Sequence, residues 1–380
     1  MSVSFPNIPS DLRVPLFWAE MDNSEANTTQ DSGPSLLIGF ASADSSIVKN
    51  KLTIMPSAAL AGKVAGRGSQ LARMVARYRA VDPFGELWVI AVTEPDGETA
   101  KGTVTLTGNA QASGSLSLYI GAVRVQAALV TGDAPAAVAA TLAAAINANA
   151  DLPVTAAAAA GVVTLTARHK GLTGNSIPLA LNYYGTVGSE TTPDGVNAVI
   201  EAMAGGAGSP SLAATVAAMG DEPFDFIGTP FSDSASLATL ALEMNDSSGR
   251  WGYARQLYGH VYTAKIGALS DLVAFGDTMN NQHITVAGYE PAVQTAADEL
   301  VALRTARNAV FIRNDPARPT QTGELNGALP APAGSRFTLT EQQSLLKHGI
   351  ATAYAESGVL RIQRDITTYQ KNAYGVADNS

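Results

Sequence analysis

The sequence predicts an α/β protein: a core built on a mostly parallel sheet, into which an antiparallel β domain carrying one helix is inserted. Two observations support this prediction. Short, continuous apolar runs alternate with helical patterns in residues 34–93 and again after residue 210, which is typical of strands covered on both faces. Between them, residues 97–185 change to short strands with period-two alternation, separated by Gly, Asn and Ser.

Residues 1–33 are predicted to form an extended N-terminal arm, because prolines near the start prevent a helix. Within the arm, Val14–Asp22 alternates like a strand and is apolar on both sides. An apolar strand so close to a terminus must pair with a sheet. We therefore expect Leu16, Phe17 and Trp18 to contact another subunit, with an edge strand of the same subunit as the alternative.

Residues 34–96 are expected to form the first part of the core as a strand, a helix and a second strand. Ser35–Ala41 and Glu86–Val92 are continuous apolar runs, as in buried strands. Between them, Pro56–Ala80 has apolar residues at helical spacing. This order is the pattern of a parallel strand–helix–strand crossover.

Residues 97–185 are expected to form the inserted antiparallel domain. Its helix is expected over Pro135–Ala148, with Asp133 as the N-cap and Pro135 in the first turn. The expected strands are rich in β-branched residues. They are Thr103–Thr107, Ser115–Tyr119, Val123–Val130, Gly161–Thr166 and Ile177–Tyr183.

Residues 186–380 are expected to complete the core. The stretch 186–210 is polar and rich in Gly, which is typical of a linker. The alternation after it suits a mostly parallel sheet with helices on both faces. Expected helices are Leu212–Met219, Asp233–Asn245, Ala268–Asn280, Pro291–Arg307 and Thr340–His348, and expected strands are Phe224–Gly228, Leu257–Thr263, His283–Ala287, Ile350–Glu356 and Val359–Thr367.

The composition argues against several classes of function. Charged residues make up 15% of the chain, whereas an ordinary soluble domain has roughly 25%. The 24 basic and 33 acidic residues give a net charge of −9. Binding to nucleic acid or to an anionic membrane requires clustered Lys and Arg, so neither is expected. A surface with few charges suits a subunit that is buried against copies of itself.

The residues that most often hold cofactors are absent or wrongly spaced. The chain has no cysteine, which excludes disulfides, thiol nucleophiles and iron–sulfur clusters. The histidines His169, His260, His283 and His348 are not spaced as metal ligands, so no cofactor is expected. Because neither a signal peptide nor an apolar run of about 18 residues is visible, we expect a soluble protein made in a cytoplasm.

Two patterns resemble functional motifs only in part. Gly66–Gly68 before a helix is a fragment of a phosphate-binding turn, but it lacks the third glycine and does not directly follow a strand. Asp31 and His348 stand in the chain order of subtilisin-like serine proteases. A nucleophile must then follow His348, and only Ser357 and Ser380 do, neither in a suitable context. We therefore expect no catalytic residues.

Two charged segments are further candidates for chemistry. Asp221, Glu222 and Asp225 form an acidic cluster, which is more typical of a solvated turn than of an acid–base pair. In Asp315–Pro319 two prolines stiffen a loop in which Arg318 could clamp a carboxylate, with a structural ion pair as the simpler expectation.

Four stretches of the chain, taken together, resemble the motifs of a known family in order and spacing. They are Gly66–Met74 with Tyr78, Arg79 and Pro83–Trp88; Leu152–Thr155 with Val163–Gly171, Gly174 and Asn175; Asp315–Pro319 with Arg336 and Phe337; and Gly349–Thr352 with Ile366–Gln370. In their order and spacing over residues 10–380, the chain resembles the contractile tail sheath proteins of myoviruses, in particular those of Mu-like phages and prophages.

This resemblance implies a structural subunit of a virion tail, assembled in the host cytoplasm, and not an enzyme. Such subunits would polymerise as helical rings around a tail tube and contract to drive the tube through the host envelope, with the tube protein and the baseplate as partners. The resemblance also implies a core often called subtilisin-like, an inserted domain that faces outward, and a tube-facing C-terminal domain that we expect to be absent here.

Two other functions remain open from the sequence. A hydrolase on an α/β scaffold predicts a deep pocket with perturbed titratable groups. A tail-associated adhesin or decorating protein predicts that residues 97–185 bind a ligand by themselves.

Overall fold

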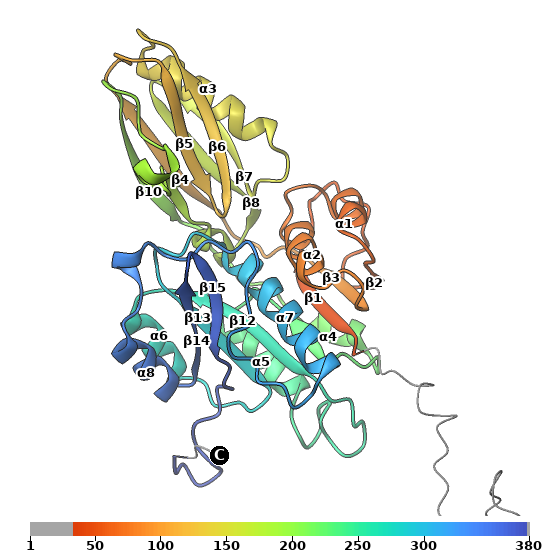
Figure 1. Cartoon of the computed structure of the whole chain (residues 1–380). Helices are drawn as coiled ribbons and strands as arrows, with labels where there is room; N and C mark the ends of the chain where they lie inside the picture. Colours follow the sequence, from red (N-terminus) through yellow and green to blue (C-terminus); the bar gives the residue numbers. More distant parts are fainter. Residues whose placement is uncertain (1–32, 378–380) are drawn as a thin grey trace, which may run out of the picture. The chain divides into compact units, whose positions relative to one another are not determined.

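The computed structural model describes residues 33–377, which form a mixed α/β fold with one large sheet and two smaller ones (Figure 1). This confirms the predicted class. The expected inter-subunit residues Leu16, Phe17 and Trp18 lie outside the described residues. Within the described range, no helix is long and apolar enough to cross a membrane.

The large sheet forms the core of the fold. In spatial order its strands are β15 (Val359–Arg364), β14 (Ile350–Glu356), β13 (Ile284–Tyr289), β12 (His260–Ile266), β11 (Phe226–Gly228), β1 (Ser35–Phe40), β3 (Leu87–Val92) and β2 (Leu52–Ile54). The strands from β14 to β3 run parallel, and β15 and β2 pair antiparallel at the two edges. The apolar runs predicted to be buried strands, β1 and β3, lie side by side in this sheet.

Helices cover both faces of the large sheet because its strands are apolar on both sides. In β1, for example, Leu37 packs into one core, while Leu36, Ile38 and Phe40 pack into the other. The helices on the side of Leu37 are α1 (Ala58–Val64), α2 (Gln70–Val81) and α7 (Ala297–Asn314), and those on the other side are α4 (Ala213–Met219), α5 (Ser234–Glu243), α6 (Leu269–Gly276) and α8 (Leu339–Lys347).

Residues 98–207, which we call the β region, contain the two smaller sheets. One sheet has the order β10 (Asn197–Ala204), β4 (Thr99–Thr107), β8 (Val162–Lys170) and β7 (Val154–Ala159), and the other has the order β6 (Val123–Leu129), β5 (Gly114–Ile120) and β9 (Leu179–Leu181). All pairs in both sheets are antiparallel. The helix α3 spans Pro135–Ala148, which confirms its predicted bounds. It shares one apolar core with both sheets.

The structure corrects the single helix expected over residues 56–80. The chain forms α1 and α2 instead, separated by a turn in which Gly66 and Gly68 have φ angles of 88° and 73°. Such angles lie in the left-handed region, which interrupts a right-handed helix. The new helix begins at Gln70, where the Ser69 side chain accepts a hydrogen bond from the N–H of Ala72 (3.2 Å).

Three further expectations were wrong in their details. The stretch 186–210 is not only a linker, because β10 lies in it and pairs with β4, so the antiparallel sheets extend past residue 185. Helix α7 begins at Ala297 rather than at Pro291. Asp133 does not cap α3: its side chain accepts from the N–H of Val130, and the N-cap is Ala134.

Candidate functional site

The histidines have side-chain partners, but none forms a metal site. His283 Nε2 lies 2.9 Å from Asp246 Oδ1, and His260 Nε2 lies 2.8 Å from Thr285 Oγ1. Burial lowers the pKa of His260 to about 4. Among residues 33–377, no group of three or more His, Cys, Asp and Glu side chains could hold a metal ion.

The partial resemblance to a serine protease has no support in the described residues. His348 Nδ1 lies 2.6 Å from Asp277 Oδ1, so it has a carboxylate partner. Ser357 occupies the turn between β14 and β15, whereas His348 caps the C-terminus of α8, two residues before β14 begins at Ile350. A strand of this length separates the two by about 20 Å, since each residue advances the chain by about 3.3 Å. Asp31 and Ser380 lie outside the described range.

The turn Gly66–Gly68 contacts the β region instead of forming a phosphate site. A Cβ on Gly68 would lie 2.5 Å from the carbonyl oxygen of Ala150 and 2.6 Å from that of Leu152. Only a glycine permits so close an approach of the two backbones. Next to it, Arg67 forms a bidentate ion pair with Asp151, at 2.8 and 2.6 Å. Both of these side chains are more than half exposed, so the ion pair adds little stability.

A buried polar contact between the β region and the core centres on His169, near the end of β8. Its Nε2 accepts a hydrogen bond from the backbone N–H of Gln70 (3.0 Å), and its Nδ1 lies 2.6 Å from Glu94 Oε1. Gln70 is the first residue of α2, so His169 satisfies one of the donors that every helix leaves unpaired at its N-terminus. The Gln70 side chain in turn accepts from the N–H of Phe40, the last residue of β1 (3.1 Å). We refer to this group of four residues as the joint.

The joint is continuous with an ionic cluster between α2 and α7. Arg73 Nη2 lies 2.5 Å from Asp298 Oδ2, and Arg73 Nη1 lies 3.1 Å from Glu299 Oε1. Arg77 reaches the other oxygen of Glu299 at 2.7 Å. Burial raises the pKa of Asp298, while the charge of Arg73 acts in the opposite direction. These pairs fix the start of α7 against the helix that carries Gln70.

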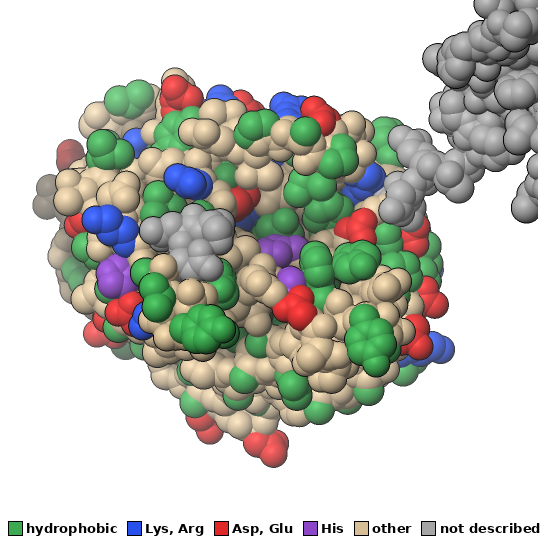
Figure 2. Space-filling view, turned by 90° about the horizontal axis from the view of Figure 1, so that it is seen from below, with side chains coloured by type: hydrophobic (Ala, Val, Ile, Leu, Met, Phe, Trp, Pro, Cys, Tyr) green, Lys and Arg blue, Asp and Glu red, His purple; other side chains and the backbone are tan. Residues whose placement is uncertain are grey.

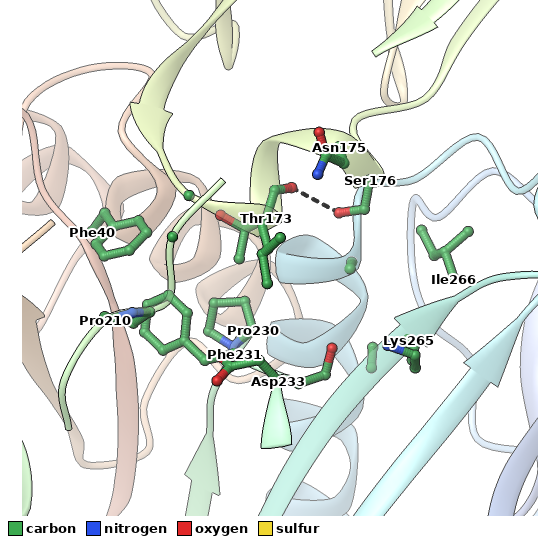
Figure 3. A pocket seen from close by; sticks show the side chains of 16 residues that line it. Phe40, Thr173, Asn175, Ser176, Pro210, Pro230, Phe231, Asp233, Lys265 and Ile266 are labelled. Carbon is green, nitrogen blue, oxygen red and sulfur yellow. Dashed lines mark hydrogen bonds between the residues drawn. The ribbon is translucent and has the colours of Figure 1, made fainter. Parts of the chain in front are cut away.

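A cavity of about 300 Å³ lies beside the joint, at the carboxyl ends of β1, β11 and β12. Phe40 and Phe231 line one side of it, and Lys265 and Ile266 line the other (Figure 3). The carboxyl edge of a parallel sheet, where the chain changes direction, is the usual ligand site of open α/β folds. The cavity therefore has the position that a hydrolase on this scaffold would use.

The chemistry of the cavity does not match its position. The Asn175 side chain donates a hydrogen bond to the carbonyl of Gly206 and accepts one from its N–H. The Ser176 hydroxyl donates to the carbonyl of Thr173 (Figure 3). These side chains therefore hold the backbone rather than point together at a substrate. Burial lowers the pKa of Lys265, whose Nζ lies 4.5 Å from the centroid of the Phe275 ring. No nucleophile–base pair lines the cavity among the residues that the structure describes.

The charged segments singled out from the sequence are ordinary surface features. Asp221 is largely exposed and lies 3.3 Å from Arg255. The guanidinium of Arg318 stacks on Phe311, 3.7 Å from the ring centroid, so the expectation of an ion pair there was wrong. The face in Figure 2 carries acidic and basic side chains singly among apolar and uncharged ones. That face therefore offers no basic patch of the kind that binds nucleic acid.

Comparisons with known proteins agree on one family. Residues 205–368 match the family described as the phage tail sheath protein central domain. A curated relative from Haemophilus influenzae, a Mu-like prophage FluMu tail sheath protein, is 36% identical over 391 residues, which cover 100% of this chain and 77% of that protein.

Two solved structures are also similar. A sheath tail protein from Desulfitobacterium hafniense has a TM-score of 0.46 at 14% identity, covering 96% of this chain and 77% of that one. A sheath tail protein from Listeria innocua has a TM-score of 0.43 at 11% identity, covering 91% of this chain and 72% of that one.

Proposed function

The chain belongs to the phage tail sheath family, and we propose that it polymerises as helical rings around a tail tube and contracts to drive that tube through the host envelope. Membership rests on the 36% identity that extends over the whole chain. The protein is accordingly a structural component of a virion tail and not an enzyme. Identical subunits, the tube protein and the baseplate are the proposed partners, and the host cytoplasm is the proposed place of assembly.

The proposed mechanism of contraction is a rigid-body rearrangement of subunits, as in other switching assemblies. Its support is the way in which the described residues hold together. Buried ion pairs connect α2 with α7, and apolar cores lie on both faces of the large sheet. Such a body moves more readily as a unit than by internal deformation, because packed interiors are stiff.

We also propose that the β region is an inserted, outward-facing domain on a subtilisin-like core. The chain enters and leaves the β region at adjacent residues: Glu98 and Ala207 exchange two backbone hydrogen bonds of 3.1 Å each. A short linker could therefore replace residues 99–206 without stretching the core.

The excised β region is expected to unfold cooperatively on heating, because its two sheets and α3 share their own apolar core. Circular dichroism of the fragment 98–207 measures this directly. The remaining chain, closed with a short Gly-Ser linker, should also unfold cooperatively. A β region without a thermal transition would show that it depends on the core and is not a domain.

The N-terminal arm is proposed to pair with a sheet of another subunit through Leu16, Phe17 and Trp18. This proposal is supported by the sequence of the arm, which is apolar on both sides over Val14–Asp22. Substituting Phe17→Pro removes a backbone donor and fixes φ, so it disrupts strand pairing.

The substitution Phe17→Pro is expected to abolish tube formation while leaving the melting temperature of the monomer nearly unchanged. Negative-stain electron microscopy and differential scanning calorimetry measure the two effects, with Phe17→Leu as the control that keeps the donor. Normal tubes from Phe17→Pro, or a strongly destabilised monomer, would identify the segment as an internal strand instead.

A further inference from the structure

The protonation state of His169 follows from its two hydrogen bonds. Because Nε2 accepts from the N–H of Gln70, it carries no proton, and the proton of the neutral ring lies on Nδ1, facing Glu94. Burial raises the pKa of Glu94, but the hydrogen bond and the charge interaction with His169, together with the backbone N–H of Lys170 and the charge of Lys49, hold that pKa below its ordinary value. The joint therefore consists of a neutral imidazole between a carboxylate and a helix N-terminus.

This arrangement connects parts of the chain that are far apart in sequence. His169 belongs to β8 of the β region, whereas Gln70 begins α2, and Glu94 follows β3 of the core. His169 is 8% exposed, and its ring packs against Phe40, with 5.6 Å between the ring centroids. One buried side chain thus holds the β region to a core helix and, through Glu94, to the chain that follows a core strand.

A second proton on His169 is incompatible with the contact to Gln70. It would place the Nε2–H against the backbone N–H of Gln70, so that two donors face one another at the positive end of a helix dipole. The carboxylate of Glu94 favours the charged ring, but it lies on the Nδ1 side and cannot accept from Nε2.

The other charged groups near the ring offer no replacement acceptor. Arg73 of α2 and Arg168 of β8 line the same small space, Lys170 is next but one to Arg168 along β8, and all are cationic. Lys49 acts on Glu94 with the same sign. The remaining acid, Asp298 of α7, is held by Arg73 at 2.5 Å.

We propose that His169 is a pH-sensitive positioning residue that holds the β region to α2 while its ring is neutral and releases α2 when the ring takes up a proton. The sign follows from the geometry: the bond to Gln70 is present while the ring is neutral and is lost when Nε2 takes up a proton. In an assembled sheath, this release would loosen the β region on its core; that consequence rests on the proposed function, whereas the joint itself does not.

The test is ¹⁵N NMR of the protein from pH 8 to pH 5, which reports both ring nitrogens of each histidine. At pH 8 we expect the proton of His169 on Nδ1 and a bare Nε2. On the same samples, hydrogen exchange of the Gln70 amide, corrected for the intrinsic effect of pH, should become about two- to tenfold faster once His169 is protonated, the effect of one net hydrogen bond.

Two variants complete the experiment. In His169→Leu the Gln70 amide should exchange rapidly at every pH. In His348→Gln, which alters an exposed His–Asp pair away from the joint, the pH dependence should remain.

A proton on Nε2 of His169 at pH 8, or a Gln70 amide whose protection does not change when His169 titrates, would overturn the proposal. Because the readouts come from the isolated chain, they stand whether or not the protein forms tubes.

Discussion

Replacing Arg304 with Met is expected to lower the free energy of unfolding by about 3–5 kcal/mol, the usual effect of removing one partner of a buried ion pair. Arg304 lies on α7 with 1% of its surface exposed. Its guanidinium donates to the Asp365 carboxylate, to the Tyr289 hydroxyl (3.3 Å) and to the carbonyl of Thr352 (3.2 Å). The variant leaves Asp365 with the Asn308 amide as its remaining side-chain donor among the described residues.

Chemical denaturation followed by circular dichroism measures this loss. The double variant Arg304→Met/Asp365→Asn should recover part of it, because it also removes the unpaired charge. Arg318→Met is the matched control, since Arg318 is exposed and its guanidinium stacks on Phe311; its effect should stay within about 1 kcal/mol. Equal losses for Arg304→Met and Arg318→Met would show that the buried cluster does not hold α7 against β13 and β14.

Gly68→Ala is expected to lower the free energy of unfolding by roughly 2–3 kcal/mol, the upper part of the ordinary range for single substitutions. The methyl group would lie within 2.6 Å of two backbone carbonyl oxygens, those of Ala150 and Leu152. Backbone cannot move aside as a flexible side chain can. The turn must therefore separate from the β region, which strains the neighbouring joint.

The control variant Gly358→Ala measures the cost of a positive φ angle alone, without the close contact between backbones that Gly68 makes. Gly358 has φ of 78°, close to the 73° of Gly68, but a Cβ there would meet nothing within 4 Å. Its substitution should therefore cost only about 1 kcal/mol, the price of the left-handed angle for a side chain. If the two variants melt alike, the close approach of the turn to the β region contributes nothing.

Helices and strands that are specified by their own local sequence pattern could be predicted from the sequence. The strands β1 and β3 are continuous apolar runs, and α3 is an alanine-rich segment with a proline in its first turn, so each carries its own signal. By contrast, β2 has three residues and β7 is mostly alanine. Both form because a partner strand is present, and pairing partners are not visible in a local pattern.

The joint could not be predicted, for the same reason. The two stretches that contain its centre, Gly66–Met74 and Val163–Gly171, both belong to the set that indicated the family. Nothing in either stretch shows that they touch, because Gln70 and His169 are 99 residues apart in the chain. Gly68 was the one local feature that could indicate this contact, but a glycine there is equally compatible with a phosphate-binding turn.

We propose that this protein is a polymerising subunit of a contractile tail sheath. The most direct test is electron microscopy of the protein expressed without any other tail component. We expect long hollow tubes with helical symmetry and the width of a contracted sheath. Uniform single particles at all concentrations, with no tubes or rings, would contradict it.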